Sequence, residues 1–92
     1  MAHHKDAIKR IKQNEKRRLR NKSVRTVYRN RIKQVKIAVA AGDLESAQTA
    51  LLSARRAIDQ AVTKKVLHKN TAARYISRLS RSVNTLKSEK AA

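Results

Sequence analysis

Several residue types are missing or scarce in this 92-residue chain. It has no cysteine, proline, tryptophan or phenylalanine, and only one glycine. Without cysteine there is no disulfide framework and no thiolate metal site. Without proline, and with a single glycine, almost nothing interrupts helices. No apolar run approaches the roughly 18 to 20 residues of a transmembrane helix, and no apolar segment follows the N-terminal charges. We therefore expect neither a membrane span nor a secretory signal.

Acidic residues are scarce as well. Six Asp and Glu residues stand against 24 Lys and Arg residues, which gives a formal net charge of +18. The acids are scattered along the chain, and no motif has the residue spacing of a catalytic or metal site. His68 is isolated, and the pair His3-His4 lies near the N-terminus. We therefore expect a protein that is not an enzyme and that binds no metal or other cofactor.

The most prominent positive feature is a dense basic run. Between Lys5 and Lys36 there are 14 basic residues and two acidic ones, Asp6 and Glu15. Up to Arg25 the basic residues fall on every face of a helix, and two carboxylates cannot pair with ten cations. The phosphates of a nucleic acid offer a matching array of negative charge. An anionic membrane surface is the second possibility, but it requires an apolar face, which residues 12–18 lack.

A single turn signal divides the chain. Gly42 is followed directly by Asp43 and, two residues later, by Glu45. Glycine accommodates the left-handed conformation just past a helix end. Asp43 can accept hydrogen bonds from the N–H groups that open the next helix, and Glu45 suits the positive end of that helix's dipole. Gly42-Asp43 therefore predicts a tight turn between two helices.

Apolar residues recur at helical spacing on both sides of this turn. The stripe before the turn consists of Val24, Tyr28, Ile32, Val35 and Val39. The two stripes after it consist of Ala47, Leu51, Ala54, Ile58, Ala61 and Val62, and of Ala72, Ile76, Leu79, Val83 and Leu86. A break lies between these two stripes, and we expect Asn70 or Thr71 to cap the helix that follows it. Residues 88–92 are expected to fray.

These patterns predict an all-α fold, a three-helix bundle in one domain spanning residues 1–92. The expected helices cover about residues 5–41, 43–65 and 69–87. The apolar stripe of the first helix starts only at Val24, so the helix has no apolar face to pack against the other two before that residue. We therefore predict that its N-terminal part, residues 5–22, projects from the bundle as a basic arm.

Aromatic residues are limited to two tyrosines. Tyr28 lies on the apolar stripe and is expected in the core, whereas Tyr75 fits either the core or its rim. Stacking on unpaired bases therefore has little support in the sequence. The composition favours contact with the phosphates and sugars of folded, double-helical nucleic acid, recognised by its shape.

Two strings in the chain resemble a known family. One is Lys5-Asp6-Ala7-Ile8-Lys9-Arg10 with the later Glu15-Lys16-Arg17-Arg18 and Asn21, and the other is Leu67-His68-Lys69-Asn70-Thr71-Ala72-Ala73-Arg74. Together with Gly42-Asp43 they resemble the bacterial small-subunit ribosomal protein S20 family. The resemblance implies a three-helix bundle with a long first helix that binds small-subunit ribosomal RNA early in assembly. Two departures are His3, where the family often has Asn, and Lys65, where it often has Gly.

The residues expected to contact RNA form two groups. The resemblance implies a contact role for Lys5, Lys9, Arg10, Lys16, Arg17, Arg18, Asn21, Arg25, Arg29, His68, Lys69, Asn70 and Arg74. Charge and helical spacing add Lys12, Arg20, Lys22, Arg78 and Arg81. The resemblance implies a structural protein of the small subunit in the cytoplasm. Its expected partners are 16S-type ribosomal RNA and neighbouring subunit components, with no homo-oligomer. A histone-like protein that compacts DNA remains the alternative.

Overall fold

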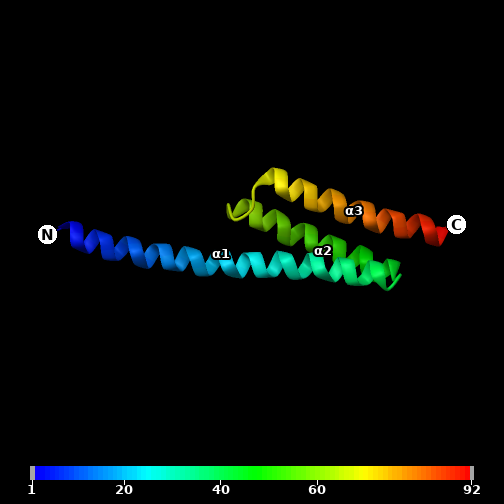
Figure 1. Ribbon diagram of the computed structural model, residues 1–92, viewed down its shortest axis with the longest axis horizontal. Coiled ribbons are helices and arrows are strands. Elements are labelled where there is room, and N and C mark those ends of the chain that lie inside the picture. The colour runs from blue at the N-terminus through cyan, green and yellow to red at the C-terminus, as the bar shows by residue number, and fades with distance from the viewer. Residues whose placement is uncertain (1, 92) are drawn as a thin grey trace.

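Helices are the only regular secondary structure over residues 2–91, which are the residues that the computed structural model describes. Three helices follow one another: α1 (Ala2–Ala40), α2 (Leu44–Thr63) and α3 (Lys69–Ala91). The predicted all-α fold with a long first helix is therefore confirmed. The molecule is a narrow rod of 73 × 21 × 14 Å, and α1 runs along most of its length (Figure 1).

The helix ends differ from the predicted ones in three places. α1 begins at Ala2 rather than near Lys5, and α3 continues to Ala91, so the predicted fraying of residues 88–91 is not found. Ala92 lies outside the described residues. The predicted cap of α3 is also wrong. Asn70 and Thr71 lie inside the helix, and the Nδ1 atom of His68 accepts a hydrogen bond from the Asn70 N–H at 3.1 Å. His68 is therefore the N-cap residue of α3, a position where Ser, Thr, Asp and Asn are preferred.

The α1–α2 turn has the geometry that the sequence predicts. Gly42 adopts φ +73°. Its N–H bonds to the Val39 carbonyl at 3.0 Å, and the Asp43 N–H bonds to the Ala38 carbonyl at 3.1 Å. These two bonds satisfy carbonyls left open at the end of α1. Asp43 then caps α2, and hydrogen bonds from the hydroxyl and the N–H of Ser46 lower the pKa of its carboxyl.

The α2–α3 loop repeats this helix ending without a glycine. The N–H of Lys65 bonds to the Val62 carbonyl at 3.0 Å, and the N–H of Val66 bonds to the Ala61 carbonyl at 2.9 Å. This geometry places Lys65 at φ +59°, a left-handed conformation that side chains with a Cβ seldom adopt. The structure therefore holds Lys65 in a strained backbone conformation.

Two opposite substitutions test these turns. Gly42→Ala is expected to lower the free energy of unfolding by about 1 kcal/mol, because the left-handed backbone strains any residue with a Cβ. A Cβ at Gly42 would meet no atom within 4 Å, so no clash adds to that strain. Lys65→Gly is expected to raise the free energy of unfolding by a similar ~1 kcal/mol. Urea unfolding followed by circular dichroism measures both changes. If the two substitutions changed the free energy of unfolding in the same direction, the left-handed conformation of both residues would be contradicted.

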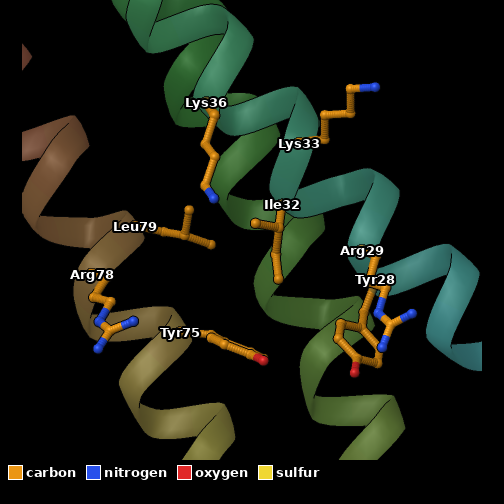
Figure 2. A pocket seen from close by; sticks show the side chains of 8 residues that line it. All are labelled: Tyr28, Arg29, Ile32, Lys33, Lys36, Tyr75, Arg78 and Leu79. Atoms are coloured by element: carbon orange, nitrogen blue, oxygen red, sulfur yellow. The ribbon is translucent and has the colours of Figure 1, made fainter.

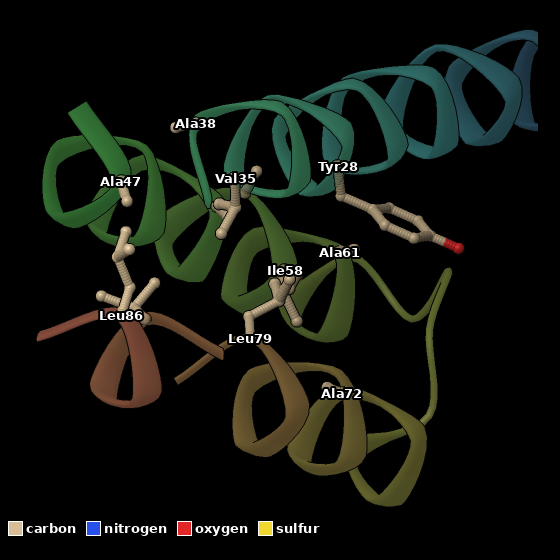
Figure 3. Packing of buried hydrophobic residues seen from close by; sticks show 12 residues of the cluster. Tyr28, Val35, Ala38, Ala47, Ile58, Ala61, Ala72, Leu79 and Leu86 are labelled. Atoms are coloured by element: carbon tan, nitrogen blue, oxygen red, sulfur yellow. The ribbon is translucent and has the colours of Figure 1, made fainter. Parts of the chain in front are cut away.

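The core is built around α2. Both α1 and α3 pack mainly against α2 and touch each other little. Among residues 5–91, twelve hydrophobic residues are buried and half of them are alanine, so few large side chains hold the helices together (Figure 3). Ile58 of α2 and Val35 of α1 are the largest that are fully buried among the described residues. Ala57, which lies off the predicted α2 stripe, is also buried because α2 has partners on two sides.

The length of α2 determines how much of α1 is packed in the bundle. The turn folds α2 back along α1, so residues equally far from the turn lie side by side. The 20 residues of α2 therefore reach back to about residue 22 of α1. All residues from 5 to 20 are exposed, and the first partly buried one is Asn21. The structure thus has the predicted projecting arm (Figure 1).

Candidate nucleic-acid interface

The basic arm, residues 5–22, is a helix without a protein partner. Its composition explains the helix, because Lys, Arg, Gln, Glu, Ala and Leu all have good helix propensity and neither Pro nor Gly occurs. Its apolar residues do not form a packing face. Ile8, Ile11 and Leu19 are exposed by 43%, 63% and 65%. The arm therefore offers its whole circumference to solvent or to another molecule.

The sequence-predicted contact residues of the arm are all exposed, apart from Asn21. They are Lys5, Lys9, Arg10, Lys12, Lys16, Arg17, Arg18, Arg20 and Lys22. Successive residues of an α-helix turn by 100°, so these side chains leave the helix in every direction. Each can meet a phosphate, and the arginines can engage two oxygens of one phosphate at once. This geometry suits a rod with nucleic acid on more than one side.

One row of cations continues from the arm onto the bundle. It consists of Arg18, Lys22, Arg25, Arg29, Lys33 and Lys36, spaced by three or four residues along one side of α1. All six residues are exposed, and the row is about 27 Å long at ~1.5 Å per residue. We call it the α1 basic stripe. Lys33 and Lys36 were not among the predicted contacts, although their spacing from Arg29 could have revealed them.

The second predicted cluster gathers at the start of α3. His68, Lys69, Asn70 and Arg74 are exposed there. Since α2 reaches back to about residue 22, this end of α3 lies level with the base of the arm (Figure 1). The free N–H groups of a helix start carry partial positive charge, which adds to that of Lys69. The His68 ring has one nitrogen occupied by the cap and the other free for a contact.

The three arginines of α3 lie on one side of the helix, spaced by four and three residues. Arg74, Arg78 and Arg81 are all exposed. Arg78 lines the groove between α3 and α1, across from Arg29 (Figure 2). Arg81 instead lies beside a hydroxyl-rich stretch of the outer face of α3 that includes Ser77 and Ser80. The structure therefore places Arg78 beside the α1 basic stripe, while its helix neighbour Arg81 borders the outer hollow.

Asn21 marks the point where the arm leaves the bundle. Its side chain is half-buried, and its Oδ1 atom is covered without a hydrogen-bond partner. A polar atom in this state costs free energy relative to one exposed to water. The sequence-based resemblance gives Asn21 an RNA contact, whereas the structure places it at the edge of the protein core.

Other kinds of site find no support among residues 2–91. No group of three or more His, Asp or Glu residues is arranged to hold a metal ion there. No helix in this range is long and apolar enough to cross a membrane. No charged or polar residue among residues 5–91 is buried, so the positive charge there lies at the surface and is available to a polyanion.

Comparisons with known proteins point the same way. The sequence matches the family described as ribosomal protein S20 over residues 2–84. The small ribosomal subunit protein bS20 of Solidesulfovibrio magneticus is 54% identical, over 96% of this chain and 99% of that protein. Proteins of the same name from Geobacter metallireducens and Maridesulfovibrio salexigens are 52% and 54% identical, each over 94% of this chain and 99% of the relative.

Proposed function

The chain belongs to the ribosomal protein S20 family, and we propose that it acts in the small ribosomal subunit as a clamp on folded ribosomal RNA. It is a structural protein of that subunit and not an enzyme. Family membership also disfavours the DNA-compacting alternative. The observation that carries the proposed mechanism is the exposed basic arm, since every residue from 5 to 20 is exposed and no protein segment packs on it.

The mechanism is electrostatic. The arm inserts between RNA helices and neutralises phosphates on several sides, which lets the RNA segments approach each other. The bundle holds the base of the arm and presents the start of α3 to a neighbouring RNA segment. The partner is 16S-type ribosomal RNA, with other subunit proteins in contact only by proximity. The protein works as a monomer in the cytoplasm, within the ribosome.

Salt dependence tests this mechanism. If the protein neutralises about six to ten phosphates, its affinity for small-subunit ribosomal RNA falls by roughly 10³ to 10⁵ between about 50 and 200 mM salt. Filter binding with purified RNA measures the slope. A nearly flat dependence on salt would contradict the electrostatic clamp.

A competition experiment separates RNA from DNA. Folded small-subunit RNA is expected to displace labelled RNA from the protein at a much lower concentration than duplex DNA with the same number of phosphates. The shape and 2′-hydroxyls of an RNA helix differ from those of DNA. Equal displacement by the two competitors would favour the DNA-compacting alternative. Co-sedimentation of the chain with the small subunit after a low-salt wash provides the control in the native particle.

A further inference from the structure

A groove lies between α1 and α3, with its lining drawn from both helices. It exists because the two helices pack on α2 and leave a gap between themselves. Its cavity volume is about 360 Å³, which is within the usual size range of ligand pockets. Its apolar residues are Tyr28, Ile32, Tyr75 and Leu79 (Figure 2). Its basic residues are Arg29, Lys33, Lys36 and Arg78.

We propose that this groove holds an unpaired nucleotide of the bound ribosomal RNA. The base lies on the exposed part of the Tyr75 ring, and the phosphates next to it are bound by the surrounding Lys and Arg side chains. This inference rests on the proposed function and adds a mode of recognition to it. The arm binds paired RNA through phosphates alone, whereas the groove selects a base that has left its helix.

Two of the groove's apolar residues are tyrosines, which provide its aromatic rings. Tyr28 is only 5% exposed and belongs to the core. Its ring centroid lies 6.4 Å from that of Tyr75, with the planes tilted by 32°. The rings contact each other at this separation, so Tyr28 supports Tyr75 from one side. Tyr75 is partly exposed and lines the groove, where a base can stack on it.

The charges around the groove favour a nucleic acid over an apolar peptide. Cations stand on both walls, and no acidic residue lines the cavity. In Figure 2 the Lys36 side chain extends from α1 toward α3, where Leu79 and Arg78 lie. An apolar helix docked here would leave these cations without partners, at a cost in free energy. A nucleotide supplies both a flat apolar ring and an anion next to it.

The α1 basic stripe connects this groove to the arm. Arg29, Lys33 and Lys36 belong both to the stripe and to the wall of the groove, and Arg18 and Lys22 continue it onto the arm. An RNA strand whose phosphates bind along the stripe therefore extends from the arm to the groove. This continuity is what distinguishes an RNA occupant from an acidic peptide, which needs no contact with the arm.

Nuclear magnetic resonance of the full chain tests the proposal, because both tyrosines of the protein line the groove. With ¹³C-labelled tyrosine, the aromatic spectrum reports on this groove alone. We expect a short single-stranded oligoadenylate to shift the Tyr75 ring resonances through the ring current of the stacked base. A blunt RNA duplex with the same number of phosphates is expected to bind without this shift.

Two substitutions at one position give the matched control. Tyr75→Leu is expected to weaken oligoadenylate binding about tenfold, while Tyr75→Phe, which keeps the ring, binds like the wild type. Duplex binding is expected to stay unchanged in both. Equal affinities of the two variants for oligoadenylate would overturn the proposal, and thermal unfolding shows whether each variant is folded.

Other outcomes separate this inference from the proposed function. If oligoadenylate binds but leaves Tyr75 unshifted, no base enters the groove, while the proposed clamp on paired RNA stands. If a short polyglutamate peptide shifts Tyr75 and oligoadenylate does not, the groove binds protein and the inference is wrong. If neither the duplex nor small-subunit ribosomal RNA binds at all, the proposed function itself fails.

Discussion

Removing five cations from the arm is expected to lower the affinity for small-subunit ribosomal RNA by roughly three orders of magnitude at about 0.1 M salt. The variant replaces Lys9, Arg10, Lys16, Arg17 and Arg20 with glutamine. Glutamine is uncharged and shorter than lysine or arginine, but it keeps most of their helix propensity, so the arm remains a helix. If each cation neutralises one phosphate, the slope of log affinity against log salt becomes shallower by about 4 to 5.

A second variant controls for net charge. It replaces five exposed cations outside the predicted interface with glutamine, namely Arg31, Arg55, Arg56, Lys87 and Lys90. Both variants have the same net charge, and so nonspecific attraction falls equally in the two. We expect the control to lose much less affinity than the arm variant. Equal losses in filter binding would show that the arm has no special part in RNA binding.

Truncating Ile58 is expected to bring the bundle close to unfolding. This side chain is fully buried between the helices, and Ile58→Ala removes about 2 to 5 kcal/mol from the free energy of unfolding. A small domain has only about 0.05 to 0.15 kcal/mol of stability per residue. The loss corresponds to a fall in melting temperature of roughly 10 to 30 °C, measured by circular dichroism. The effect is large because half of the buried residues are alanine and few other side chains can compensate.

Leu52→Ala on the same helix is the control for this prediction. Leu52 is 54% exposed, so its truncation is expected to change the free energy of unfolding by no more than about 0.5 kcal/mol. Addition of small-subunit ribosomal RNA is expected to restore the helicity of the Ile58→Ala variant, because a ligand of the folded state stabilises it. If both variants melt alike, the core does not lie where the structure places it.

The sequence predicts the three helices because it has no proline and its single glycine lies in a turn. The spacing from Val24 to Val39 gives one face of α1, and the glycine and aspartate at the turn give its end. The predicted cap of α3 is wrong, and the sequence leaves the conformation of Lys65 open, because both residues act outside their usual roles. His68 caps α3 through a ring nitrogen, and Lys65 adopts the conformation usual for glycine. Neither role follows from propensity, because each depends on the path of the neighbouring chain.

Part of the candidate interface can be predicted from the sequence, and part of it cannot. The arm is predictable from charge and from the missing apolar stripe, since both are local properties of the sequence. The groove is not, because it depends on how far apart α1 and α3 lie on α2. Tyr28 and Tyr75 are remote in the chain, and only the packing brings their rings together. Arg78 and Arg81 look equivalent on the sequence pattern, yet only Arg78 lines the groove.

The continuity of α1 has a mechanical consequence. The helix passes from bundle to arm without a proline, a glycine or a break, so the two parts cannot swivel independently. The tip at Lys5 lies about 25 Å beyond the last supported turn, at ~1.5 Å per residue. Seating the bundle against one stretch of RNA therefore aims the tip at a fixed distance and angle. On the proposed function, the bundle and the arm can together bind only RNA folds whose two binding surfaces lie at that distance and angle.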